Sequence, residues 1–149
     1  MFLEEILADK SVAFDEIVSW AARGFGIPMG AVVVESEESR GGPLGDEIEI
    51  LIEVGGAVGD FPAHLSFFAR SPRTENVERN ALVDDFARHF QAQLLVSDSS
   101  PDPYRMTYVK PDGSRELVRL NAEALDSGDA YVVEGPYVPE ESEESEESS

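Results

Sequence analysis

DEIEILIEV, residues 46–54, alternates between apolar and mostly acidic side chains with a period of two. Successive side chains of a β-strand point to opposite faces of its sheet, so this period is typical of a half-buried strand. The alternation gives two faces, one with Ile48, Ile50, Ile52 and Val54 and the other with Glu47, Glu49, Leu51 and Glu53. We predict an antiparallel strand with its isoleucine face in the core.

Strand-like segments lie on both sides of this stretch. AVVVE (31–35) is rich in β-branched residues, and HLSFFAR (64–70) directs Leu65, Phe67 and Ala69 to one side. Further along the chain the segments are LLVSD (94–98), YRMTYVK (104–110), RELVRLN (115–121) and AYVVE (130–134). PDGS (111–114) predicts a hairpin turn between two of them, because proline fixes φ and glycine accepts a positive φ.

Two segments have the period of an amphipathic helix. The first spans residues 11–23, with Ser11 suited to cap its start and Gly24 to end it. The second runs from Thr74 to about Leu94 and carries a broad apolar stripe. Its surface has acid-before-base pairs spaced i,i+4, which stabilise helices: Glu75 with Arg79, Asp84 with Arg88, and Asp85 with His89.

The order of these segments predicts an α+β fold with a mostly antiparallel sheet and two main helices. The chain has 149 residues, which fits one domain, and we assign residues 1–139 to it. Residues 140–149, EESEESEESS, contain no apolar side chain and six of the 31 acidic residues. Such a segment cannot bury enough surface to offset its chain entropy, so we expect a disordered acidic tail.

The net charge of −20 indicates which partners the protein attracts. A strongly acidic surface repels DNA, RNA and anionic membranes and attracts basic proteins. A second interpretation is that acidity maintains solubility in a high-salt host, since only Lys10 and Lys110 among the 11 basic residues are lysines.

The compartment is predicted from the start of the chain. MFLEEILADK (1–10) is acidic where a signal peptide is basic, and no apolar run approaches the roughly 18 residues that a membrane span needs. We therefore expect a cytoplasmic protein.

Few residues have the chemistry of a catalytic or metal site. There is no cysteine, and the two histidines are His64 and His89. The crowded segment at residues 98–104, in which SSPDPY follows an aspartate, has no basic side chain beside its serines and fits a turn. The remaining enzymatic alternative is a small hydrolase that uses Asp85 with His89, or carboxylates of the strands. We favour a non-enzymatic protein, and we assign no catalytic residue, cofactor or metal.

The C-terminal part of the chain suggests a family. Residues 96–133, which end in YRMTYVKPDGSRELVRLNAEALDSGDAYVV (104–133), together with the small size and acidity of the chain, resemble bacterial immunity proteins of polymorphic or contact-dependent toxin systems. The resemblance covers the style of roughly residues 60–135 and carries over no family residue. It implies a cognate toxin as the basic partner.

The candidate partner-binding residues are acidic and belong to the first two predicted strands and the loop between them. Like charges on one sheet face repel one another, so a chain that keeps them is expected to use them. If the two strands pair as a hairpin, these carboxylates lie together: Glu35, Glu37, Glu38, Glu47, Glu49 and Glu53.

Deleting residues 140–149 is expected to leave the thermal midpoint nearly unchanged, because the tail has no apolar anchor to dock on the domain. Thermal denaturation of the full and shortened chains checks this. A large drop would mean that the tail stabilises the fold.

Overall fold

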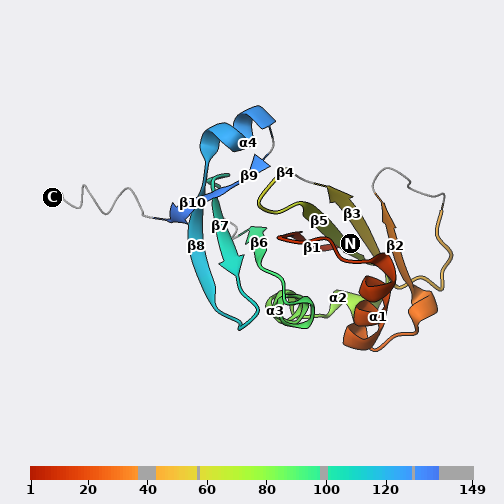
Figure 1. The fold of residues 1–149 in the computed structure, drawn as a ribbon. Coiled ribbons are helices and arrows are strands. Elements are labelled where there is room, and N and C mark those ends of the chain that lie inside the picture. Colours follow the sequence, from red (N-terminus) through yellow and green to blue (C-terminus); the bar gives the residue numbers. More distant parts are fainter. Residues whose placement is uncertain (37–42, 57, 98–100, 129, 138–149) are drawn as a thin grey trace.

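A computed structural model describes residues 1–36, 43–56, 58–97, 101–128 and 130–137 (Figure 1). Glu37, Glu38, residues 98–100 of the crowded segment and the acidic tail lie outside the described residues. What the sequence predicts for them stays a prediction.

In the described part of the chain, eight strands form one sheet in the order β10-β8-β7-β6-β1-β5-β3-β2. Their bounds are β1 (Phe2–Ala8), β2 (Val32–Ser36), β3 (Ile50–Gly56), β5 (Ala63–Ala69), β6 (Leu94–Ser97), β7 (Arg105–Val109), β8 (Arg115–Leu120) and β10 (Val133–Pro136). Two short strands, β4 (Val58–Gly59) and β9 (Ala130–Tyr131), pair separately. The helices are α1 (Phe14–Phe25), the 3₁₀ turn η1 (Met29–Ala31), α2 (Pro72–Glu75), α3 (Arg79–Phe90) and α4 (Ala122–Gly128). The α+β class and the mostly antiparallel sheet are confirmed.

The hairpin expected between the first two predicted strands is wrong. These strands are β2 and β3, and they pair in parallel, with Glu35 opposite Glu53. A parallel pair needs a connection of about a dozen residues to return the chain to the same end of the sheet, and residues 37–49 provide that length. The alternation in DEIEILIEV determined which face is buried but held no information on the direction of the neighbouring strand.

The N-terminal segment, which shows no strand pattern, forms β1 in the middle of the sheet. β1 pairs with β5 on one side and β6 on the other. Ile6, Leu7 and Ala8 are consecutive and all buried, because both faces of the sheet are covered at this point. A register shift between Phe2 and Glu4 disturbs the alternation further.

Helices α1, α2 and α3 lie together on one face of the sheet (Figure 1). Trp20 of α1 is 1% exposed and makes edge-to-face contacts with Phe67 of β5, at 6.0 Å, and Phe86 of α3, at 5.1 Å. This aromatic group joins both long helices to the strand face that the sequence predicted to be buried, including Leu65 and Ala69.

The second predicted helix is split into α2 and α3. Pro72 begins α2 at a position that tolerates proline, and Glu78 begins α3 by accepting hydrogen bonds from the backbone of Asn80 and Ala81. Gln91 ends α3 in a left-handed conformation with φ 52°. The boundaries of α1 also differ from the prediction, because Gly26, at φ 69°, ends it in place of Gly24.

A smaller core lies on the opposite face, under α4 and β9. It contains Leu7, Phe61, Leu95, Val118 and Leu120. The predicted hairpin of β7 and β8 supplies part of this core, and its turn has Gly113 at φ 91°. This core covers one half of the second face, over β1, β6, β7 and β8.

Phe86→Ala is expected to reduce the free energy of unfolding by about 3–5 kcal/mol, because Phe86 is 0% exposed and its removal leaves a cavity in the aromatic group. Phe90→Ala should cost less, since Phe90 is only partly buried. Denaturant titration measures both, with Phe14→Ala as the control. Phe14 is 41% exposed, and its truncation should cost less than about 1 kcal/mol. A loss as small for Phe86 would contradict the packing described above.

Candidate functional site

The second half of the face opposite the helices, over β2, β3, β5 and the start of β1, forms what we call the open sheet face. Among the described residues, no helix lies over it (Figure 1). Strand register places its side chains in two adjacent cross-strand rows. The apolar row is Val33, Leu51, Phe68 and Phe2, and the acidic row is Glu35, Glu53, Ser66 and Glu5.

Side chains of both rows reach solvent. Phe2 is 47% exposed, and its ring meets that of Phe68 edge to face at 5.8 Å. The side chain of Glu5 is 51% exposed and its carboxylate pairs with Nε2 of His64, a partner that the sequence pattern did not reveal. The open sheet face therefore presents an apolar strip beside an acidic one.

The structure brings together only part of the predicted partner-binding set. Glu35 and Glu53 are directly opposite each other on β2 and β3 and are partly exposed. Glu47 is exposed in the turn that precedes β3, outside the two rows. Glu5, which the sequence pattern missed because β1 was not recognised, completes the row.

Glu49 has a structural role that its position in the pattern does not indicate. Its carboxylate accepts hydrogen bonds from Arg73, at 2.5 and 2.7 Å, and from the Ser71 hydroxyl at 2.8 Å. The hydroxyl of Thr74 donates to the Glu49 backbone carbonyl at 2.9 Å. These bonds fasten α2 to the start of β3. The bonds from Arg73 and Ser71 lower the pKa of Glu49 from an ordinary 4.5 to about 2.

The Asp85 and His89 pair expected as a catalytic alternative does not form. Asp85 accepts a hydrogen bond from Trp20 Nε1 at 2.7 Å and another from Arg88 at 2.9 Å. His89 Nδ1 accepts from Arg23 at 3.0 Å. Tertiary partners on α1 have thus displaced the local i,i+4 contact, which removes the main support for a hydrolase.

The other i,i+4 pairs of this region also differ from the prediction. Asp84 pairs with Arg115 of β8 at 2.8 Å. Glu75 and Arg79 belong to different helices. The acidic residues of α3 therefore link the helix to its surroundings.

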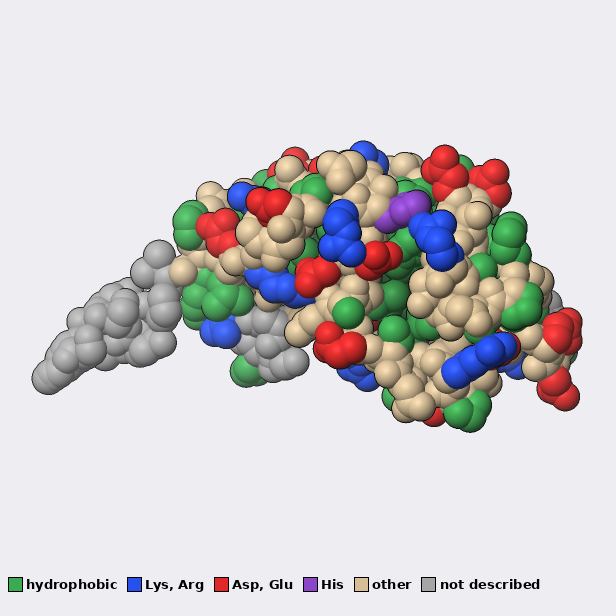
Figure 2. Space-filling model, turned by 90° about the horizontal axis from the view of Figure 1, so that it is seen from below, with side chains coloured by type: hydrophobic (Ala, Val, Ile, Leu, Met, Phe, Trp, Pro, Cys, Tyr) green, Lys and Arg blue, Asp and Glu red, His purple; other side chains and the backbone are tan. Residues whose placement is uncertain are grey.

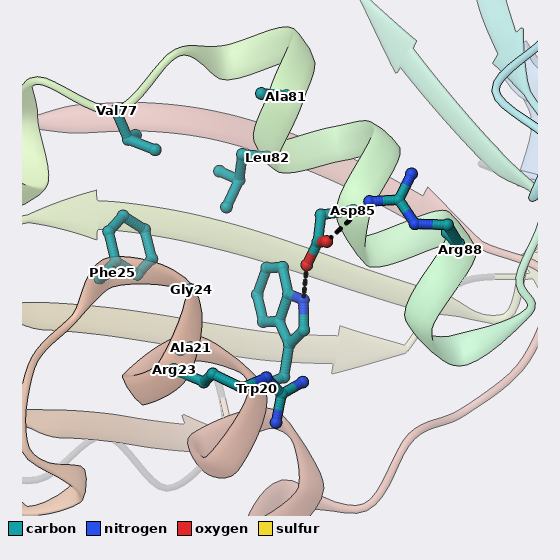
Figure 3. A pocket seen from close by; sticks show the side chains of 10 residues that line it. All are labelled: Trp20, Ala21, Arg23, Gly24, Phe25, Val77, Ala81, Leu82, Asp85 and Arg88. Carbon is teal, nitrogen blue, oxygen red and sulfur yellow. Dashed lines mark hydrogen bonds and ion pairs between the residues drawn. The ribbon is translucent and has the colours of Figure 1, made fainter.

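A cavity of about 430 Å³ lies between α1 and α3 on the helical side of the sheet (Figure 3). We call it the interhelical cavity. It is lined by Trp20, Ala21, Arg23, Gly24, Phe25, Val77, Ala81, Leu82, Asp85 and Arg88. Seen from this side, basic and acidic side chains are mixed over the surface and apolar side chains are visible between them (Figure 2). The helical side is thus less uniformly acidic than the net charge suggests.

Metal-binding clusters and membrane-spanning helices are both absent from the part of the chain that the structure describes. Its residues contain no group of three or more acidic, histidine or cysteine side chains arranged to hold a metal ion. Each helix in the described ranges is too short or too polar to cross a membrane.

No family model matches the chain, and no curated protein or solved structure is significantly similar to it. The resemblance to immunity proteins therefore stays a prediction, and function has to be argued from the geometry above.

Glu49→Gln is expected to reduce the thermal midpoint most above pH 4.5 and progressively less as the pH falls toward 2. The folded pKa of Glu49 lies below its ordinary value, so the carboxylate stabilises the fold above pH 4.5 and loses this effect as it becomes protonated. Thermal denaturation of wild type and variant between pH 7 and pH 2 measures the difference. Glu47→Gln is the control, because Glu47 is an exposed neighbour in the turn. A difference that stays constant with pH would contradict the assignment.

Proposed function

We propose that the protein is a non-enzymatic binding protein that engages a basic protein partner through the open sheet face. The observation that carries the proposal is the acidic row of Glu35, Glu53 and Glu5 beside a partly exposed apolar row. Stable protein interfaces combine an apolar centre with polar groups around it, and the two rows supply both.

Electrostatics favours a basic occupant. Glu35 and Glu53 are directly opposed like charges, an arrangement that is unfavourable in the isolated sheet. Guanidinium or ammonium groups of a partner would relieve this repulsion. The net charge of −20 would also accelerate association with a basic protein at low ionic strength.

In this proposal the partner is a toxin domain and the protein is its bacterial immunity protein, acting in the cytoplasm. The acidic face would cover a basic surface that the toxin needs for its own substrate. The same charge disfavours nucleic acids and anionic membranes as partners.

The charge-reversed variant Glu35→Lys with Glu53→Lys is expected to slow association with the basic partner at least about tenfold at low salt, since electrostatic steering raises association rates by roughly 10–1,000-fold. The partner is first captured from the host with the wild-type protein, then purified. Association rates are measured at several salt concentrations, and the difference between wild type and variant should shrink as salt screens the charges.

Two further variants make the test specific. Glu35→Gln with Glu53→Gln removes the charges with little change in shape and should give a smaller loss. Glu16→Lys with Glu75→Lys changes the net charge by the same amount at exposed positions on α1 and α2, away from the open sheet face. Equal losses for both charge-reversed variants would show that only net charge matters, which supports the high-salt interpretation. Failure of the wild type to bind any purified basic protein from its host would overturn the proposal.

A further inference from the structure

The interhelical cavity has an apolar wall built from three segments. Trp20 and Phe25 come from α1, Leu82 from α3, and Val77 from the link between α2 and α3 (Figure 3). Trp20 and Leu82 are buried at 1% and 8% exposure. The volume of about 430 Å³ lies within the range of roughly 300–1,000 Å³ that is typical of small-molecule sites.

The polar side of the cavity is held in place by a chain of hydrogen bonds. Trp20 Nε1 donates to one oxygen of Asp85 at 2.7 Å, and Arg88 donates to the other at 2.9 Å (Figure 3). Both oxygens of Asp85 are thus engaged by the protein itself. The carboxylate orients Arg88 and balances one of the positive charges of the lining.

Arg23 supplies a second guanidinium. It donates to Nδ1 of His89 at 3.0 Å, so this nitrogen accepts the bond and carries no proton. An arginine has five N–H donors, and in the described residues one bond of Arg23 and one of Arg88 are made to protein side chains. The lining therefore has two guanidinium groups against one carboxylate, in a chain with 11 basic and 31 acidic residues.

We propose that the interhelical cavity binds a small amphipathic carboxylate, with its apolar part against Trp20 and Leu82 and its carboxylate at Arg23 and Arg88. Guanidinium groups form strong charge-assisted hydrogen bonds with carboxylates, which selects an anion over a neutral or cationic molecule of the same shape. This site is independent of the proposed function, because it lies on the helical side of the sheet and uses none of the open-face residues.

Octanoate is a suitable probe, and Trp20 reports its binding because it is the only tryptophan of the chain. Titration should give a saturable change in intrinsic fluorescence and a shift of the single indole N–H resonance. Octanamide and octylammonium have the same apolar chain without the negative charge. We expect octanoate to bind about tenfold more tightly than octanamide, as one or two charge-assisted hydrogen bonds would give, and octylammonium to bind more weakly still.

Variants locate the binding. Arg23→Gln with Arg88→Gln alters two exposed side chains and should abolish the preference for octanoate over octanamide. Ala81→Leu adds volume at the cavity wall on a helix that tolerates leucine, and should weaken binding of both probes. Arg79→Gln removes a charge from α3 outside the lining and should change neither.

Three results would overturn the proposal. The first is no saturable response to octanoate, and the second is equal or tighter binding of octanamide or octylammonium. The third is octanoate binding that Ala81→Leu leaves unchanged, because the probe would then occupy another place. Thermal denaturation of each variant confirms that any loss of binding occurs in a folded protein.

Discussion

The hydrogen bond from Trp20 to Asp85 joins the two long helices at the point where both pack on the sheet. The indole is buried against Phe67 and Phe86, and a buried N–H without a partner would cost about 1–3 kcal/mol. Asp85 satisfies this donor from the neighbouring helix, so the position of α1 relative to α3 is set by one directional contact inside an otherwise non-directional aromatic group. The same contact fixes one wall of the interhelical cavity.

Sequence periodicity predicted the buried faces of the sheet well, since burial of Ile50, Ile52, Leu65 and Phe67 follows directly from alternation. It failed where tertiary contacts compete with local ones. Asp85 and His89 have the right spacing for a pair, yet a buried indole N–H and the Arg23 guanidinium provide stronger partners. Of the candidate partner-binding acids, Glu35 and Glu53 are brought together, whereas Glu49 is occupied by Arg73, which lies 24 residues away and cannot be identified by spacing. Glu5 was missed because β1 is buried on both faces at its C-terminal end and shows no alternation.

The two sides of the sheet differ in character despite the uniform composition of the chain. The helical side concentrates arginines around an apolar cavity, while the open sheet face concentrates carboxylates beside exposed phenylalanine. Opposite charges on opposite sides would keep a small anionic ligand away from the acidic rows and a basic protein away from the arginines. The fold thus separates two kinds of binding by geometry within one domain.

The central place of β1 also bears on the way the chain is made. The first strand to leave the ribosome pairs with β5 and β6, so its neighbours are synthesised roughly 60 to 90 residues later. Until then its apolar residues Ile6 and Leu7 have no sheet to join, and the remaining strands on either side have nothing to connect them. Contacts between residues so distant in sequence form slowly. The nascent chain consequently carries an unpaired hydrophobic strand through much of its synthesis, a state in which protection by chaperones has the greatest effect.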